Sequence, residues 1–251
     1  MVWHPGITLA GLLVGMVIGV TGVGGGVVTA PVLILVFGIA PASSVGCALL
    51  YSAAVKLSSS LVYLFRRQVD FPILFRMLAG GLPGALAGAY LLAHFRQLRS
   101  APVILTVVGA SVLAAALVGL RGVRLGRPAR PSPGRLPWFA FPIGLEVGFS
   151  SAGAGALGSL LLLHFTTLPP VAAVGTDLLF GMGLSLAGGG VHLAAGNWDG
   201  PVLSSLLLGG LAGAPLGSLG AGRIPARPLR VALLAWAALM GAVLLIQGLI
   251  R

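Results

Sequence analysis

The sequence predicts an all-α polytopic integral membrane protein made of two repeats, and three observations carry this prediction. Hydrophobic residues make up 57% of the chain and charged residues only 8%, whereas about a quarter of the residues of a soluble domain are charged. Apolar stretches recur at about the 20 residues that cross a hydrocarbon core. The second half of the chain also repeats landmarks of the first half. We therefore expect two inverted repeats, each opening with a glycine-broken, re-entrant-like helix pair followed by three membrane helices.

The apolar stretches divide into two sets of four. They fall at about 6–38, 42–65, 71–93 and 101–120, and then at 138–168, 170–195, 201–222 and 229–250. Between the sets, residues 121–137 are rich in arginine and proline, a composition typical of an extended, solvated linker. The predicted organisation is a first membrane repeat (1–120), a cytoplasmic linker (121–137) and a second membrane repeat (138–251).

Matched residues in the two sets indicate a duplication. The pairs are Gly22 with Gly153, Gly24 with Gly155, Val45-Gly46 with Val174-Gly175, Asp70 with Asp199, Pro83 with Pro215 and Gly88 with Gly220. Asp70 and Asp199 each stand two residues before a proline at the start of an apolar segment. Because this is the pattern of a helix N-cap, we interpret both aspartates as structural.

The first segment of each repeat is too long for one crossing. As a single helix, residues 6–38 would extend about 50 Å at about 1.5 Å per residue. Broken at its glycines, the segment gives two arms that are each too short to span the membrane. Two short arms joined by a turn predict a re-entrant hairpin that enters and leaves on one face.

The distribution of arginine supports this hairpin. If each first segment returns to its starting side, ten arginines lie in cytoplasmic loops and three outside; if each crosses once, the split is eight to five. The positive-inside rule favours the hairpin and places both termini outside. The ten are Arg66, Arg67, Arg121, Arg124, Arg127, Arg130, Arg135, Arg223, Arg227 and Arg230, and the three are Arg96, Arg99 and Arg251.

The glycine breaks are the first candidate for a binding site. Backbone groups freed by a broken helix must line a polar cavity or be buried in protein, and N–H groups at a helix start bind anions. Tight helix packing through glycine is the alternative. The predicted substrate-binding residues at the breaks are Thr21, Gly22, Gly24, Gly25, Gly26, Ser150, Ser151, Gly153 and Gly155.

Ionisable residues inside apolar segments are the second candidate, because such groups are costly in lipid and normally face a cavity or a partner. Lys56 is the only lysine in the chain and lies mid-segment. It is either the counter-charge of an anionic substrate or half of an ion pair with Glu146 or Asp177. These two carboxylates are the predicted sites of proton coupling, although Asp177 could equally serve at a helix start.

Other functional classes lack support in the sequence. Gly153 to Gly158 match G-x-G-x-x-G, but a dinucleotide site needs a preceding strand in a soluble βαβ unit. The four histidines are scattered, and no H-E-x-x-H or G-x-S-x-G motif is present, so we expect no enzyme, no metal and no cofactor. The net charge of +11 arises mostly between apolar segments, which predicts contacts of the linker with anionic lipid headgroups and no nucleic acid.

The first break carries a recognisable pattern, Gly15-x-x-x-Gly19-x-x-Gly22-x-Gly24-Gly25-Gly26 followed by Pro31. It resembles the opening signature of the TauE/SafE family of sulfite and organosulfonate exporters. The resemblance implies a multi-pass permease of the bacterial inner membrane that transports a small anion, such as a sulfur oxyanion or organosulfonate. Transport by alternating access at a midplane site, with a coupling proton, is the expected mechanism. A passive anion channel and a non-transporting membrane scaffold are the alternatives, and the oligomeric state is open.

Overall fold

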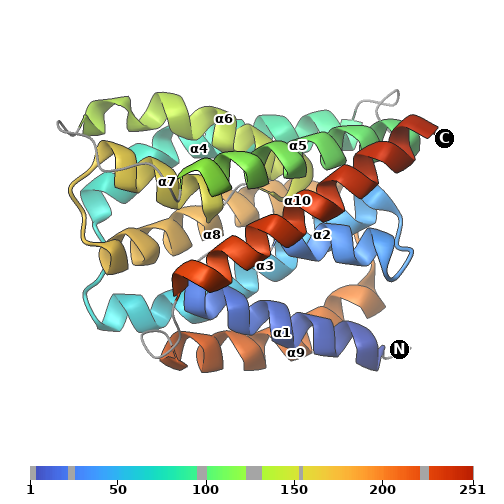
Figure 1. The fold of residues 1–251 in the computed structure, drawn as a ribbon, viewed down its shortest axis with the longest axis horizontal. Coiled ribbons are helices and arrows are strands. Elements are labelled where there is room, and N and C mark those ends of the chain that lie inside the picture. The colour runs from blue at the N-terminus through green and yellow to red at the C-terminus, as the bar shows by residue number, and fades with distance from the viewer. Residues whose placement is uncertain are drawn as a thin grey trace.

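The computed structural model describes residues 4–21, 26–94, 101–122, 132–152, 155–220 and 226–250, and these ranges contain helices and no strand (Figure 1). The predicted all-α class is therefore confirmed. The first half consists of α1 (Pro5–Thr21), α2 (Gly26–Leu35), α3 (Pro41–Phe65), α4 (Phe71–His94) and α5 (Ala101–Gly122). The second half consists of α6 (Leu136–Ser150), α7 (Ala156–Phe165), α8 (Pro170–Ala194), α9 (Gly200–Gly220) and α10 (Ala226–Ile250), with a 3₁₀ turn, η2 (Pro133–Arg135), before α6.

Six helices are long and apolar enough to cross a membrane, and they fall three to each half: α3, α4 and α5, then α8, α9 and α10. The first segment of each half is broken as predicted. The arms α1, α2, α6 and α7 have 17, 10, 15 and 10 residues, shorter than the roughly 20 residues of a full span. Gly22, Gly24, Gly25 and Gly153 lie in the breaks, outside the described residues.

The packing of each half mirrors that of the other. Helix α1 packs on α9 and α6 packs on α4, while α2 contacts α3 and α10 as α7 contacts α8 and α5. The counterpart helices α3 and α8 also pack together, and so do α5 and α10. The contacts of one half are thus repeated by the equivalent helices of the other, which supports the duplication read from the sequence.

Counterpart helices run in opposite directions. Near the start of α3, Gly46 lies against Asn197, and after its end Gln68 lies against Gly175. Likewise Gly119, late in α5, lies against Leu234, early in α10. Figure 1 places the N- and C-termini at the same end of the bundle. Antiparallel counterparts are what two inverted repeats require.

Glycines bring the first arm of each half against a helix of the other half. On α1, Gly11, Gly15 and Gly19 recur at every fourth residue and face the backbone of α9. On α4, Gly80, Gly84 and Gly88 face the backbone of α6 in the same way. Because lipid supplies no hydrophobic drive between helices, such close backbone packing is a main source of association energy in a membrane.

The two aspartates confirm their predicted role as N-caps. Asp70 Oδ1 accepts a hydrogen bond from the backbone N–H of Ile73 at 2.9 Å. Asp199 Oδ1 accepts one from Val202 at 3.0 Å. The backbone N–H of each aspartate donates in turn to the opposite half, to Thr176 Oγ1 at 3.0 Å and to Cys47 Sγ at 3.3 Å.

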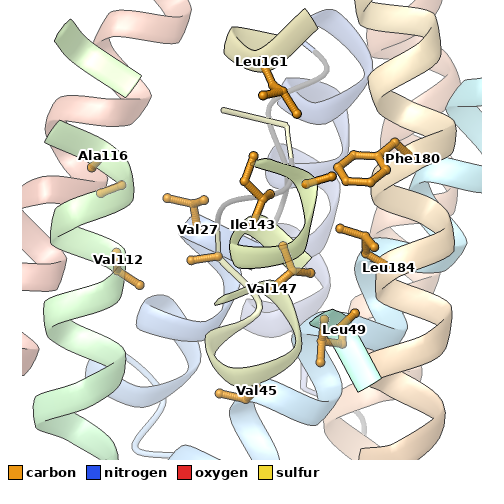
Figure 2. Packing of buried hydrophobic residues seen from close by; sticks show 14 of the residues in the cluster. Val27, Val45, Leu49, Val112, Ala116, Ile143, Val147, Leu161, Phe180 and Leu184 are labelled. Atoms are coloured by element: carbon orange, nitrogen blue, oxygen red, sulfur yellow. The ribbon is translucent and has the colours of Figure 1, made fainter. Parts of the chain in front are cut away.

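The larger apolar core lies where the broken segments meet the long helices. Figure 2 shows Ile143 and Val147 of α6 between Val112 of α5 and Phe180 of α8, with Val27 of α2 beside them. Val27 directly follows Gly26, the first described residue after the first break. The start of α2 is therefore buried in this core.

Candidate functional site

Two residues that flank the glycine breaks, Gly26 and Ser151, touch each other. Ser151, at the end of α6, donates a hydrogen bond from Oγ to the backbone oxygen of Gly26 at 3.3 Å. The Cα of Gly26 also lies so close to the Ser151 backbone that a Cβ there would overlap the carbonyl group. Glycine at this position is thus required by a close approach of two chain segments. The structure brings together two residues that the sequence predicted as parts of one site.

Side chains hold the second break in shape. Ser151 adopts the left-handed conformation at φ 63° and Gly155 has φ 99°, so the helix cannot continue through them. Ser150 Oγ donates to the Glu146 backbone oxygen at 3.1 Å and accepts from the Ala152 N–H at 3.2 Å.

His192 completes the end of α6 from a distant part of the chain. Its buried Nε2 lies 3.2 Å from the backbone oxygen of Gly148. That oxygen would accept from Ala152 in a continuous helix, but the Ala152 N–H donates to Ser150 instead. Asn197 Nδ2 lies 3.5 Å from His192 Nδ1, an arrangement that suits a neutral ring with its proton on Nε2. His192 is therefore a structural cap for the second break.

Asp177 of α8 lies against the first turn of α7, just after the second break. Its side chain is fully buried, and Oδ2 accepts a hydrogen bond from Ser159 Oγ at 2.6 Å. The Cα of Gly158 approaches the same carboxylate so closely that a Cβ would overlap Oδ1. Asp177 is thus buried well inside α8 rather than capping its start. Ser159 was not predicted as a site residue from the sequence. Its position in the first turn of the helix after the break could have identified it as a candidate.

Lys56 of α3 is fully buried, and its Nζ has no hydrogen-bond partner within the described part of the chain. Asp177 is the carboxylate that acts on it electrostatically. Of the two partners predicted for Lys56, the structure therefore favours Asp177 over Glu146. Asp177 thus contacts the start of α7 through Ser159 and acts on Lys56 electrostatically, and we call these three residues the polar cluster.

Of the remaining predicted residues, Thr21 and Glu146 lie within the described helices. Thr21 is buried at the end of α1 and donates from Oγ1 to the Val17 backbone oxygen at 2.8 Å. Glu146 lies one turn before Ser150 on α6, and its Oε1 is buried with no hydrogen-bond partner among the described residues. The described ranges contain no group of three or more His, Cys, Asp or Glu residues that could hold a metal ion.

Comparisons with known proteins agree with this architecture. The model of the family described as "Sulfite exporter TauE/SafE" matches residues 7–244. The "Probable membrane transporter protein YjnA" of Bacillus subtilis (strain 168) is 28% identical over 266 residues, which cover 97% of this chain and 97% of that relative. No solved structure matches the chain. Since the family model spans nearly all of both repeats, the chain belongs to the TauE/SafE family of membrane transporters.

Proposed function

We propose that this protein is a secondary transporter of small anions, with sulfur oxyanions or organosulfonates as the substrate class. The observation that carries the proposal is the polar cluster after the second break. Lys56 is fully buried without a hydrogen-bond partner in the described residues, Asp177 is electrostatically linked to it, and the start of α7 contacts Asp177. Family membership and the description of the Bacillus relative as a probable membrane transporter support this function.

The cluster suits an anion because it combines helix N-termini with a buried ammonium group. Helix α2 begins at Gly26 and α7 begins at Ala156, so the positive ends of two helix dipoles lie at the point where the breaks meet. Lys56 adds a buried ammonium group with no hydrogen-bond partner in the described residues, and burial of such a group is costly. An anion at this place would offset that cost.

Charge balance supports coupling to a proton at Asp177. With the site empty, Lys56 and Asp177 neutralise each other, and an added anion would leave one unbalanced negative charge. Protonation of Asp177 would restore neutrality, so one proton would move with each negative charge. The other titratable side chains on helices packed against α8 are Cys47, Tyr51 and Tyr63 on α3, Arg76, Tyr90 and His94 on α4, Glu146 on α6 and His164 on α7. Glu146 is the second candidate for the coupling proton.

Alternating access would follow from the packing of the two halves. The arm α1 packs on α9 and the arm α6 packs on α4, each through close glycine contacts with the opposite half. Movement of one half would therefore move the first arm of the other half with it. Rocking of inverted repeats about a central site is a common transport mechanism. In this proposal the protein lies in the bacterial inner membrane, with both termini outside and the arginines of residues 121–137 on anionic lipid headgroups of the cytoplasmic face.

Uptake into proteoliposomes tests the proposal. Radiolabelled sulfite, sulfate and methanesulfonate would be offered to vesicles with and without an imposed pH gradient, and protein-free vesicles serve as the control. We expect saturable uptake of at least one sulfur oxyanion, accumulated above its equilibrium level by the gradient. Flux that no ion gradient drives uphill would indicate a passive anion channel. Absence of flux for all three anions would contradict the substrate class.

A further inference from the structure

A second unsatisfied donor lies beside Lys56. Ser59 is fully buried on α3, and its Oγ has no hydrogen-bond partner. Among buried side-chain hydroxyls in the ranges that the structure describes, it is the only one in this state. Buried polar groups are almost always hydrogen-bonded, and an exception calls for an explanation such as an ion bound in the working protein.

Ser59 lacks the backbone hydrogen bond that other buried helical hydroxyls make. A serine or threonine in a membrane helix commonly donates to a carbonyl of the preceding turn. Ser60 does so to Leu57 at 2.9 Å, and Ser218 does so to Ala214 at 2.9 Å. Ser59 has the same option on the same helix but makes no such bond. Its hydroxyl is thus available to a ligand.

Ser59 and Lys56 project from the same side of α3. Residues three apart on a helix have Cβ atoms about 5–6 Å from each other and share a face. Both side chains are fully buried, and both donors lack a partner among the described residues. Two donors separated by one helical turn can each bond a different oxygen of one oxyanion. A halide has a single acceptor atom, which both donors would have to share.

We propose that Lys56 Nζ and Ser59 Oγ together bind the oxyanion group of the substrate, and that Ser59 sets the preference for oxyanions over halides. The inference rests on the proposed function, because it assigns two specific donors to the transported anion. Lys56 supplies the charge and Ser59 the second, directional contact.

Binding to the purified, detergent-solubilised protein tests this assignment without requiring transport. Isothermal titration calorimetry with methanesulfonate and with chloride would compare wild type, Ser59→Ala and Ser60→Ala at one pH and ionic strength. Ser60→Ala is the matched control, because it removes a neighbouring buried hydroxyl that already has a backbone partner. We expect Ser59→Ala to raise the Kd for methanesulfonate about tenfold, the loss of one hydrogen bond to a charged group, with chloride affinity and the Ser60→Ala values within about twofold of wild type.

An unchanged methanesulfonate Kd in Ser59→Ala, or an equal loss in Ser60→Ala, would overturn the inference, as would a wild-type protein that binds no methanesulfonate. The two proposals can fail separately. Methanesulfonate that binds through Ser59 but never enters proteoliposomes would refute the transport function and leave the site standing. Transport by wild type with unaltered affinity in Ser59→Ala would refute the site and leave the transport function standing.

Discussion

The helices α3 and α8 occupy equivalent places in the two halves, yet they carry different chemistry. Gly46 of α3 packs on the backbone of Asn197, and Gly175 of α8 packs on that of Gln68. The same spacing along the chain that relates Gly46 to Gly175 does not relate one charged residue to another. Lys56 then corresponds to Ser185, and Asp177 corresponds to Ala48. The scaffold positions are shared, whereas the charges are not.

This difference distinguishes the residues that build the fold from those to which the proposed function assigns a role. Glycine contacts and aspartate caps recur in both halves because equivalent helices must pack closely and begin at equivalent places in each half. One buried lysine and one buried aspartate suffice to balance each other's charge, so a duplicated lysine and aspartate would be redundant and costly in lipid. We interpret the symmetric positions as structural and the asymmetric charges as functional.

The largest expected effect is at the symmetric glycines. Gly46→Ala and Gly175→Ala each place a methyl group into the backbone of the opposite half, and overpacking of this kind costs about 1–3 kcal/mol or more. Both variants should lower the thermal unfolding midpoint in detergent and the yield of monodisperse protein. Gly190→Ala is the control on α8, because nothing lies within 4 Å of its added Cβ. A thermal midpoint equal to that of wild type in either Gly46→Ala or Gly175→Ala would contradict the structural role assigned to these equivalent glycines.

The charge pair should respond as a unit. Lys56 and Asp177 are buried opposite charges that are linked electrostatically, so removing one leaves the other uncompensated, whereas replacing both by neutral side chains avoids that cost. Lys56→Met should therefore destabilise the protein, and Lys56→Met combined with Asp177→Asn should recover most of the loss. Chemical denaturation of the three variants in one detergent measures the coupling. Additive effects of the two substitutions would show that the residues are independent.

The smallest effect is expected at the caps. Asp70→Ala and Asp199→Ala each remove one N-cap hydrogen bond, at a cost of about 0.5–2 kcal/mol. Because the two caps are equivalent, the shifts of their thermal midpoints should agree closely, and both variants should retain anion uptake. A loss of uptake in one variant alone would assign that aspartate a role beyond capping.

Much of the fold could be predicted from the sequence, because apolar length and glycine position are local signals. The predicted long segments agree with the helix bounds to within a few residues, and the breaks after Thr21 and Ser150 lie where the glycines and serines indicated. The predicted caps at Asp70 and Asp199 were also confirmed. These features depend on residues close together in the chain.

The composition of the cluster could be predicted only in part, because its contacts join residues far apart in sequence. Lys56 and Asp177 were singled out by their cost in lipid, but two carboxylates remained open as partners of the lysine. Neither the Ser159 contact with Asp177 nor the Gly148 contact with His192 has a local sequence signature. The predicted roles of Gly22, Gly24, Gly25 and Gly153, which lie outside the described residues, stay predictions.

Gradient-driven uptake by Asp177→Asn tests the central claim most directly. The claim is that Asp177 carries the proton that balances the anion held at Lys56. We expect this variant to exchange labelled for unlabelled anion across the membrane, as wild type does, but to lose accumulation driven by a pH gradient. Accumulation equal to that of wild type would contradict the account.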